Sequence, residues 1–237
     1  MNEEFLAYGL IWYVVFLLST TCHEAAHALA AKMGGDLTAS QGGQVSLNPI
    51  PHITREPFGM VLFPILTYVT GGWMMGWASA PYDPYWSQRH PHRAAWMSLA
   101  GPAANFALAT VAILVIHAGI IGGVFAPPEF ARFTQIVVSN APGAFEGAAQ
   151  FLSLLFSLNV LLGTFNLLPI PPLDGFTAAG LLMSETRARR LEQLGNNLRG
   201  YSFLGLLLGW QLFGAMFMPI FRFALSLLYP DWLMGTR

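Results

Sequence analysis

The sequence predicts an all-α protein that crosses the membrane several times. Apolar residue types make up 54% of the 237 residues and charged types only 10%, and the mean hydropathy is +0.51. Uncharged stretches recur that are long enough to span a bilayer, which takes about 20 helical residues. Prolines, glycines and charges gather between them, where loops belong. We expect about five to six membrane segments in one domain over residues 1–237, with a core at 5–185 and an extra C-terminal helix at 200–229.

The first membrane helix is predicted over residues 5–31. Residues 5–22 carry no charge. Lys32 and the pair Gly34-Gly35 follow, and a cation with glycine is typical of a helix C-terminus. A cleaved signal peptide is not expected, because the residues before this stretch are acidic rather than basic.

Residues 36–48 become short, polar and alternating. The segments 36–39 and 44–47 flank Gln41-Gly42-Gly43. This pattern predicts a small β-hairpin at the membrane surface after the first helix.

Residues 57–82 form an apolar stretch that Pro64, Gly71-Gly72 and Gly76 interrupt. These breaks favour a re-entrant segment, provided that neighbouring helices cover the interrupted backbone. A complete span is the alternative for the same residues.

Three further spans are predicted at 94–125, 147–166 and 200–228, with a short helix restarting after Asp174. Arginines gather at 83–93 and 187–199, and such loops favour the cytoplasmic side. We therefore expect a multi-pass protein of the cell membrane. The loops at 83–93 and 187–199 can both be cytoplasmic only if residues 57–82 begin and end on the same side of the membrane.

A His-Glu-x-x-His pattern ends the first membrane helix. His23 and His27 are one helical turn apart on the same face, so both rings can reach one metal ion. Glu24 borders that pair, where a base for a metal-bound water belongs. The alternative is a pair of packed histidines at a helix interface, but ionisable groups at membrane depth usually have a function.

Asp174 is the best candidate for a third metal ligand. A catalytic zinc site usually has three protein ligands and one open position. Asp174 is the only acidic residue between Gly147 and Ser184, and it follows the proline-rich stretch 169–172. The competing role for the same carboxylate is to cap the helix that restarts there.

The chain resembles the site-2 protease family of intramembrane zinc metalloproteases, in the form of its compact bacterial members. Three motifs occur in the order typical of that family: His23-Glu24-x-x-His27, Gly101-Pro102-x-x-Asn105, and Asn166-x-x-Pro169-x-Pro171-x-Leu173-Asp174-Gly175. The resemblance implies that His23, His27 and Asp174 bind one Zn2+ per chain. It also implies that Glu24 is the catalytic base and acid, and that the site faces the cytoplasmic side.

The implied reaction is hydrolysis of peptide bonds in single-span or helical membrane proteins, within or near the lipid bilayer. Asn105 and Asn166 are expected either to hydrogen-bond the substrate backbone and steady the metal ligands, or to hold helices together. The hairpin predicted at 36–47 could accept an unwound substrate as an added strand. The alternative to this strand addition is that the hairpin is only a connector.

Other function classes fit the sequence less well. The formal charge of −1 gives no reason to expect nucleic-acid binding. A metal transporter would spread polar groups across the bilayer, whereas here they cluster in one place. A relative that binds helices without cutting them would not need Glu24. Cys22 is the only cysteine, so no disulfide within the chain is possible.

Overall fold

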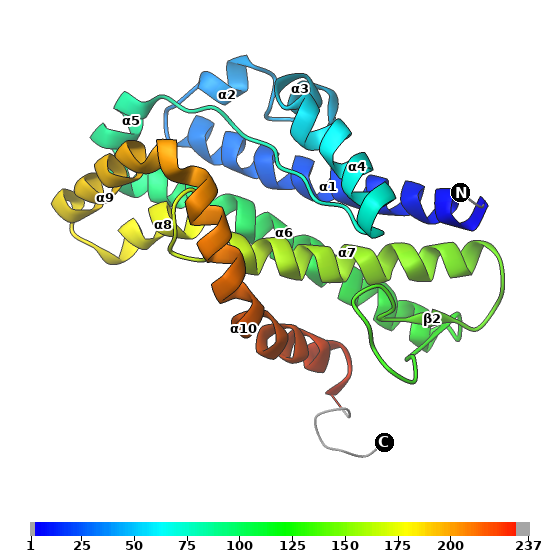
Figure 1. The fold of residues 1–237 in the computed structure, drawn as a ribbon. Helices are drawn as coiled ribbons and strands as arrows, with labels where there is room; N and C mark the ends of the chain where they lie inside the picture. The colour runs from blue at the N-terminus through cyan, green and yellow to red at the C-terminus, as the bar shows by residue number, and fades with distance from the viewer. Residues whose placement is uncertain (1–2, 231–237) are drawn as a thin grey trace.

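The structure, a computed structural model, describes residues 3–230 and is almost entirely helical (Figure 1). Within that part of the chain, four helices are long and apolar enough to cross a membrane: α1 (Glu3–Met33), α6 (Pro91–Ile121), α7 (Ala144–Asn166) and α10 (Ser202–Leu228). The predicted all-α, multi-pass architecture is therefore confirmed. The expected number of five to six membrane segments stays a prediction; besides the four long helices, the described residues include the shorter apolar helical stretch Phe58–Gly71.

The remaining elements are short. In chain order they are α2 (Thr38–Gln41), α3 (Ile50–Arg55), the π-helical turn η1 (Phe58–Leu62), α4 (Phe63–Gly71), α5 (Pro84–Arg89), β1 (Phe125–Ala126), β2 (Val138–Ser139), α8 (Asp174–Ala178), η2 (Ala179–Leu182), α9 (Glu185–Leu198) and η3 (Arg199–Tyr201).

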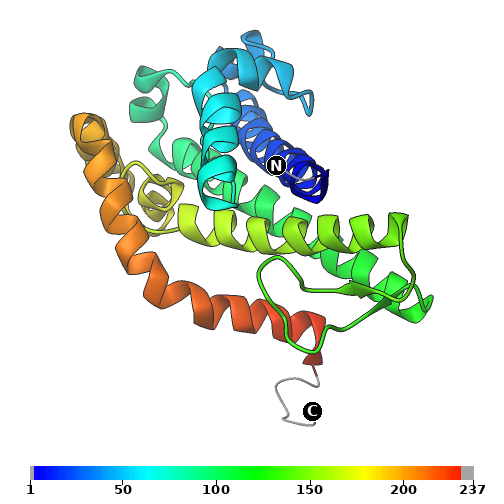
Figure 2. The same cartoon turned by 45° about the vertical axis from the view of Figure 1, so that its right-hand side comes forward.

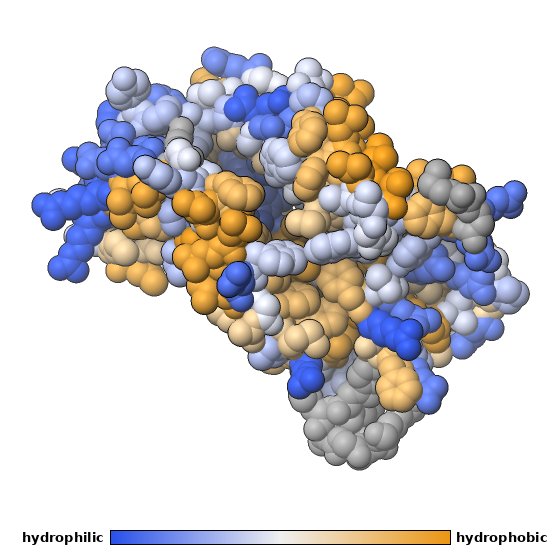
Figure 3. Space-filling view, viewed as in Figure 1, coloured by the Kyte–Doolittle hydropathy of each residue, from blue (hydrophilic) through white to orange (hydrophobic). Residues whose placement is uncertain are grey.

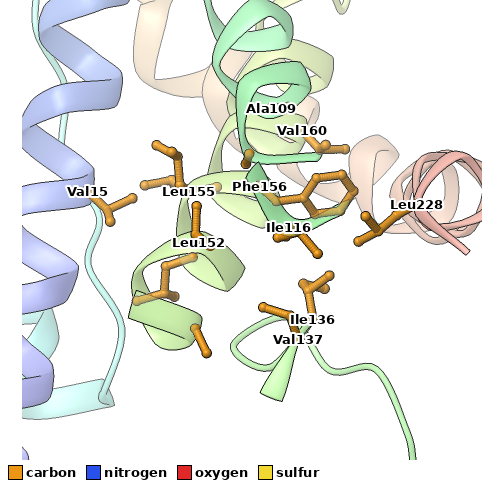
Figure 4. Close-up of a cluster of buried hydrophobic side chains, with 14 of the residues drawn as sticks. Val15, Ala109, Ile116, Ile136, Val137, Leu152, Leu155, Phe156, Val160 and Leu228 are labelled. Carbon is orange, nitrogen blue, oxygen red and sulfur yellow. The ribbon is translucent and has the colours of Figure 1, made fainter. Parts of the chain in front are cut away.

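Helix α6 lies at the centre of the bundle and packs against both α1 and α7. Their shared core is apolar, and Figure 4 shows Val15 of α1 facing Leu155 of α7 while Phe156 lies beside Ile116 of α6. Full burial of such side chains contributes about 1.5–3 kcal/mol each. This core fixes the mutual placement of α1 and α6, and thereby of the polar residues that each helix carries.

Helix α1 ends where the sequence predicts. Gly35 has a φ of +97°, a left-handed conformation that favours glycine. The carbonyl oxygen of Gly34 accepts hydrogen bonds from Trp86 Nε1 at 3.0 Å and from Arg93 Nη1 at 3.1 Å. A carbonyl group at the end of a helix has no hydrogen-bond partner within the helix, and these two donors supply one.

The predicted hairpin at residues 36–48 is wrong. The region contains the single helical turn α2, and α3 follows it. Asp36 explains the difference, because its carboxylate accepts hydrogen bonds from both the backbone N–H and the hydroxyl of Thr38. Such a side-chain turn favours a helix start over an extended strand. The small antiparallel sheet of this protein lies elsewhere, between β1 and β2.

Residues 57–83 travel in one direction as a helix and return as an extended chain. After η1 and α4, Gly72 reverses the chain with a φ of +76°. Residues 74–83 then run along α1 toward α5 without regular secondary structure (Figure 1). The extended part is tied to η1 by a hydrogen bond from Trp77 N to the carbonyl oxygen of Gly59 at 3.2 Å.

The proline-rich stretch after α7 turns the chain sharply into α8. Gly175 is required in this turn, because a Cβ at that position would overlap the backbone of Leu167 and Leu168. The helix predicted after Asp174 is present as α8 and η2. The arginine-rich segment that the sequence suggested to be a loop is instead helix α9.

Helix α10 is the most exposed of the long helices and carries a nearly continuous apolar surface. Figure 2 shows it curving past α8 and α7 toward the loop that carries β1 and β2. Pro219 lies inside this helix and removes one helical hydrogen bond. The exposed side chains Phe203, Leu207, Trp210 and Phe223 would be costly in water, so this surface indicates contact with lipid.

Candidate metal centre

His23, His27 and Asp174 come together at one point, although about 150 residues separate the first from the last in the sequence. The Nε2 atoms of His23 and His27 are 3.0 Å apart. The two carboxylate oxygens of Asp174 lie 3.1 Å from His23 Nε2 and 3.3 Å from His27 Nε2. Helix α1 presents the histidines one turn apart, and the bend before α8 brings the carboxylate to them.

The outer nitrogen of each imidazole has a partner of its own. His27 Nδ1 lies 2.7 Å from the carbonyl oxygen of Met97, which can only accept a hydrogen bond. His23 Nδ1 lies 2.6 Å from Asn105 Oδ1, which is likewise an acceptor. Both rings therefore donate from Nδ1, and both Nε2 atoms keep a free lone pair for a metal.

The donor set fits zinc. Ligand atoms about 2.0–2.1 Å from a tetrahedral zinc ion lie about 3.3 Å from one another, close to the three spacings of 3.0, 3.1 and 3.3 Å seen here. Asp174 Oδ2 is buried and makes no hydrogen bond, even though it lies beside His23 Nε2. Acceptor atoms that face one another at this distance need a cation between them.

Asp174 does not act as a helix cap here. Leu173 occupies the N-cap position of α8, and no side chain caps that helix. The carboxylate of Asp174 points toward the two histidines instead, so the capping alternative is wrong.

Gly101 leaves the space in which the donor atoms converge. A Cβ built on Gly101 would overlap the Nε2 atoms of both His23 and His27. The next residue, Pro102, lies inside α6 and has no N–H, so the carbonyl oxygen of Ser98 loses its helical hydrogen bond. Ser98 also lines the adjoining cavity. The Gly-Pro pair therefore lets α6 approach the Nε2 atoms of His23 and His27 without a side chain between them.

A cavity of about 260 Å³ opens beside the three donor residues. Glu24 lines it and is buried, with 7% of its surface exposed. His23, Glu24 and His27 each offer a ligand atom, and these atoms lie within 4.8 Å of one another. Figure 3 shows a hollow with a hydrophilic floor between the hydrophobic surfaces of α4 and α10. The cavity that Glu24 lines is large enough for several water molecules.

The structure gives Asn105 and Asn166 different environments. Asn105 is completely buried and contacts His23. Asn166 lines the cavity at the end of α7 and donates to the carbonyl oxygen of Leu162 in its own helix at 3.0 Å. Only Asn105 is in hydrogen-bond contact with one of the three donor residues.

Several residues at this site could not be recognised from the sequence. Met97 contributes through its backbone, which no side-chain pattern reveals. Asn159, one helix away, supports Asn105 but belongs to none of the three motifs. The extended residues Ala78–Tyr82 line the cavity only because the chain reverses at Gly72. Of these residues, only Asn159 has a feature that the sequence could have shown, which is an amide side chain in the apolar interior of α7.

These features define a buried zinc-type centre, with a neighbouring carboxylate, in a helical membrane protein. The sequence matches the family model of peptidase family M50 over residues 11–209. This protein therefore belongs to peptidase family M50, the site-2 protease family. It is a site-2-type metalloendopeptidase with zinc as its cofactor.

Two curated bacterial proteins are similar to it. It is 33% identical to "Putative zinc metalloprotease YwhC" of Bacillus subtilis over 179 residues, which cover 73% of this chain and 71% of that protein. It is 30% identical to "Putative zinc metalloprotease Rip2" of Mycolicibacterium smegmatis over 163 residues, which cover 69% of this chain and 53% of that protein. No solved structure matches the chain.

Proposed function

We propose that this protein hydrolyses peptide bonds of transmembrane proteins within or near the bilayer, and that His23, His27 and Asp174 hold its zinc ion. The observation that carries the proposal is the convergence of three donor atoms 3.0–3.3 Å apart beside the buried carboxylate of Glu24. All four residues lie in or next to segments that are apolar enough for a membrane.

The zinc ion and the protein contribute different chemistry. Zinc held by these residues would lower the pKa of a water molecule and polarise the carbonyl group of the peptide to be cut. Glu24 would accept the proton of the attacking water and pass it to the leaving amine. Because only 7% of the surface of Glu24 is exposed, exchange of that proton with bulk water is restricted. The charge that Asp174 brings balances part of the charge of the metal.

We propose that this chemistry takes place toward the cytoplasmic side of the cell membrane. Helices α5 and α9 carry the basic residues Arg89, Arg187 and Arg190, and both lie at the end of the bundle that holds the site (Figure 1). Basic segments favour the cytoplasm. Asp36 follows α1, and its Oδ2 accepts a hydrogen bond from Asp83 N at 2.8 Å. This contact between the two ends of residues 37–82 supports a re-entrant path rather than a complete span.

The extended residues Ala78–Tyr82 offer a place for the substrate backbone. A peptide must be unwound before it is cut, since a helix hides its carbonyl groups in internal hydrogen bonds. The carbonyl oxygen of Ser79 faces α2 and accepts from Gln44 Nε2 at 3.0 Å. Backbone groups alternate sides along an extended chain, so those of Ala78 and Ala80 face away from Gln44. Within residues 3–230 these backbone groups of Ala78 and Ala80 have no hydrogen-bond partner.

Strand addition therefore remains the proposed binding mode, at Ala78–Tyr82 rather than at the hairpin expected from the sequence. Ala80→Pro removes one backbone donor, whereas Ala80→Ser keeps it. We expect the proline variant to raise the KM for a single-span substrate about tenfold or more with zinc content unchanged, and the serine variant to stay close to wild type. Equal KM values for both variants would rule out pairing at Ala80.

Glu24→Gln tests the proposed reaction. The amide keeps the size of the side chain but cannot accept a proton, so cleavage should fall by a factor of about 10²–10⁴. Cleavage is measured in vesicles that contain the purified enzyme and tagged single-span proteins with a central Gly or Pro. Zinc content should not change. Glu185→Gln on the exposed face of α9 is the matched control. Wild-type cleavage by Glu24→Gln would exclude the proposed base.

A further inference from the structure

A line of buried polar side chains extends from His23 into the centre of the bundle. Asn105 Nδ2 of α6 donates to Asn159 Oδ1 of α7 at 2.8 Å. Asn159 Nδ2 donates to Ser19 Oγ of α1, also at 2.8 Å. None of these three side chains has measurable exposure to solvent. The line thus leaves His23, crosses two helices and returns to the helix on which it began.

Only one orientation of the two amides satisfies every group in this line. Asn159 Nδ2 also donates to the carbonyl oxygen of Leu155 at 2.8 Å, and the hydroxyl of Ser19 donates to the carbonyl oxygen of Val15 at 2.7 Å. Backbone carbonyls can only accept, so Asn159 must present its oxygen to Asn105. Asn105 must then present its amino group to Asn159 and its oxygen to His23.

The two histidines consequently have supports of different kinds. His27 donates to the backbone carbonyl of Met97, whose polarity is fixed by the chain. His23 faces a side-chain amide, and an amide that turned over would present its NH2 group. His23 Nδ1 would then have to accept, and the proton of the neutral ring would move to Nε2, where the metal is to bind. The correct state of His23 therefore depends on what holds Asn105 in place. The amino group of Asn105 donates to Asn159 Oδ1 at 2.8 Å and, over a longer contact of 3.4 Å, to the backbone carbonyl oxygen of Ser19, so Asn159 is the stronger of two supports.

We propose that Asn159, supported by Ser19, is a positioning residue for the zinc site. It fixes the orientation of Asn105, which in turn keeps the lone pair of His23 directed at the metal. This inference rests on the proposed role of His23 as a ligand and extends it to two residues outside the three sequence motifs. Neither residue touches the metal-binding atoms, so both act only through Asn105.

The competing explanation is that these amides only hold α1, α6 and α7 together, as polar side chains often do in membranes. The two explanations differ in what an altered Asn159 does to metal binding. If these residues only pack the helices together, any loss of side-chain volume in this part of α7 should weaken zinc binding. If Asn159 positions Asn105, zinc binding should weaken only when the acceptor opposite Asn105 Nδ2 is removed.

The test is the zinc affinity of the purified full-length protein, measured by competition with a fluorescent chelator. Asn159→Leu removes the acceptor, and zinc should bind about tenfold more weakly. Asn159→Asp, whose buried acid group is expected to be neutral, keeps an acceptor opposite Asn105 and a hydroxyl that can donate to the carbonyl oxygen of Leu155, so it should bind zinc within about threefold of wild type. The absorption spectrum of the cobalt-substituted protein should change in Asn159→Leu and be retained in Asn159→Asp.

Leu158→Ala is the matched control. Leu158 is buried next to Asn159 but has no polar group, so its truncation disturbs packing and leaves the amide line intact. Its zinc affinity should equal that of wild type. Ser19→Ala is a milder variant that keeps α1 helical and should weaken zinc binding about threefold through Asn159.

The outcomes separate this inference from the metal assignment. The inference is overturned if Asn159→Leu and Ser19→Ala bind zinc as tightly as wild type, or if Leu158→Ala weakens binding as much as Asn159→Leu. If His23→Ala still binds stoichiometric zinc, the ligand assignment fails. Loss of zinc in His23→Ala together with normal affinity in Asn159→Leu would refute the positioning role alone.

Discussion

The two ends of α6 belong to the same helix but serve opposite purposes. At its beginning, Met97, Gly101 and Asn105 face α1, and each leaves room or provides an acceptor for a histidine. Toward its end, Ile116 faces an apolar core and Gly119 lies against the ring of Phe125. One end of the helix keeps polar atoms available, and the other end is closed by packing.

Several polar groups at the closed end pair with one another. The hydroxyl of Ser153 accepts from the backbone nitrogens of Ile136 at 2.9 Å and Val137 at 3.2 Å. Tyr229 donates to the carbonyl oxygen of Ile136 at 2.9 Å. At the metal end, by contrast, Asp174 Oδ2 remains without a hydrogen bond. Unpaired burial is costly, and it indicates a metal site at Asp174 Oδ2 because two imidazole nitrogens lie beside this atom. Trp12 Nε1, in the apolar core, is also buried and unpaired, so the lack of a partner alone does not indicate function.

Gly101→Ala should give the largest effect. Its methyl group would occupy the position between the Nε2 atoms of His23 and His27. We expect zinc affinity to fall at least 100-fold, because the donor atoms cannot remain within bonding distance of one ion. Chelator competition measures the loss. Wild-type affinity in this variant would show that the metal does not bind where the two rings converge.

Gly119→Ala is the matched substitution at the closed end and should cost stability alone. Its methyl group would overlap the ring of Phe125. Overpacking costs about 1–3 kcal/mol, and alanine recovers about 1 kcal/mol over glycine in a helix. Thermal unfolding in detergent should therefore show a Tm a few degrees lower, with unchanged zinc affinity. A zinc defect in Gly119→Ala would mean that the two ends of α6 are coupled.

The smallest effect concerns Asp36, and it should change with pH only in the acid range. Burial by itself raises the pKa of this carboxyl group, but hydrogen bonds from Thr38 and from Asp83 N outweigh it, so the pKa lies below its ordinary value. A carboxylate whose pKa is lowered by folding stabilises the folded state above its unfolded pKa. That stabilisation is lost as the pH falls through the folded pKa.

Wild type and Asp36→Asn should accordingly differ in stability by a constant amount above about pH 5, because an unfolded aspartate titrates near 3.9. The difference should shrink below about pH 4. Thermal unfolding across this range measures it. A difference that persists at the lowest pH would show that charge on Asp36 is not what ties the end of α1 to residue 83.

Much of the site was readable from the sequence because its chemistry is carried by side chains at helical spacing. His23 and His27 lie on one helix, and a proline-rich break with a single acid predicted that Asp174 would turn inward. The predicted spans at 94–125 and 200–228 correspond to α6 and α10. Helical periodicity and long apolar stretches are local signals, so one sequence reveals them.

The parts that could not be predicted depend on contacts between distant segments. The hairpin expected at 36–48 failed because Asp36 turns the chain into α2 and also binds Asp83. The cavity wall at Ala78–Tyr82 carries no motif, since its contribution lies in the path of its backbone. Gly101 belongs to a motif that was visible in the sequence, but only the fold shows that the atoms it leaves room for are the Nε2 nitrogens of His23 and His27.

The central claim is that residues from α1 and α8 bind one ion together. The most direct test is the zinc content of purified wild-type protein and of Asp174→Ala, each measured after dialysis against a weak chelator. The account predicts one zinc ion per chain in the wild type and less than about one tenth of that in the variant. Stoichiometric zinc in Asp174→Ala would contradict the account, because His23 and His27 would then hold the metal without the carboxylate.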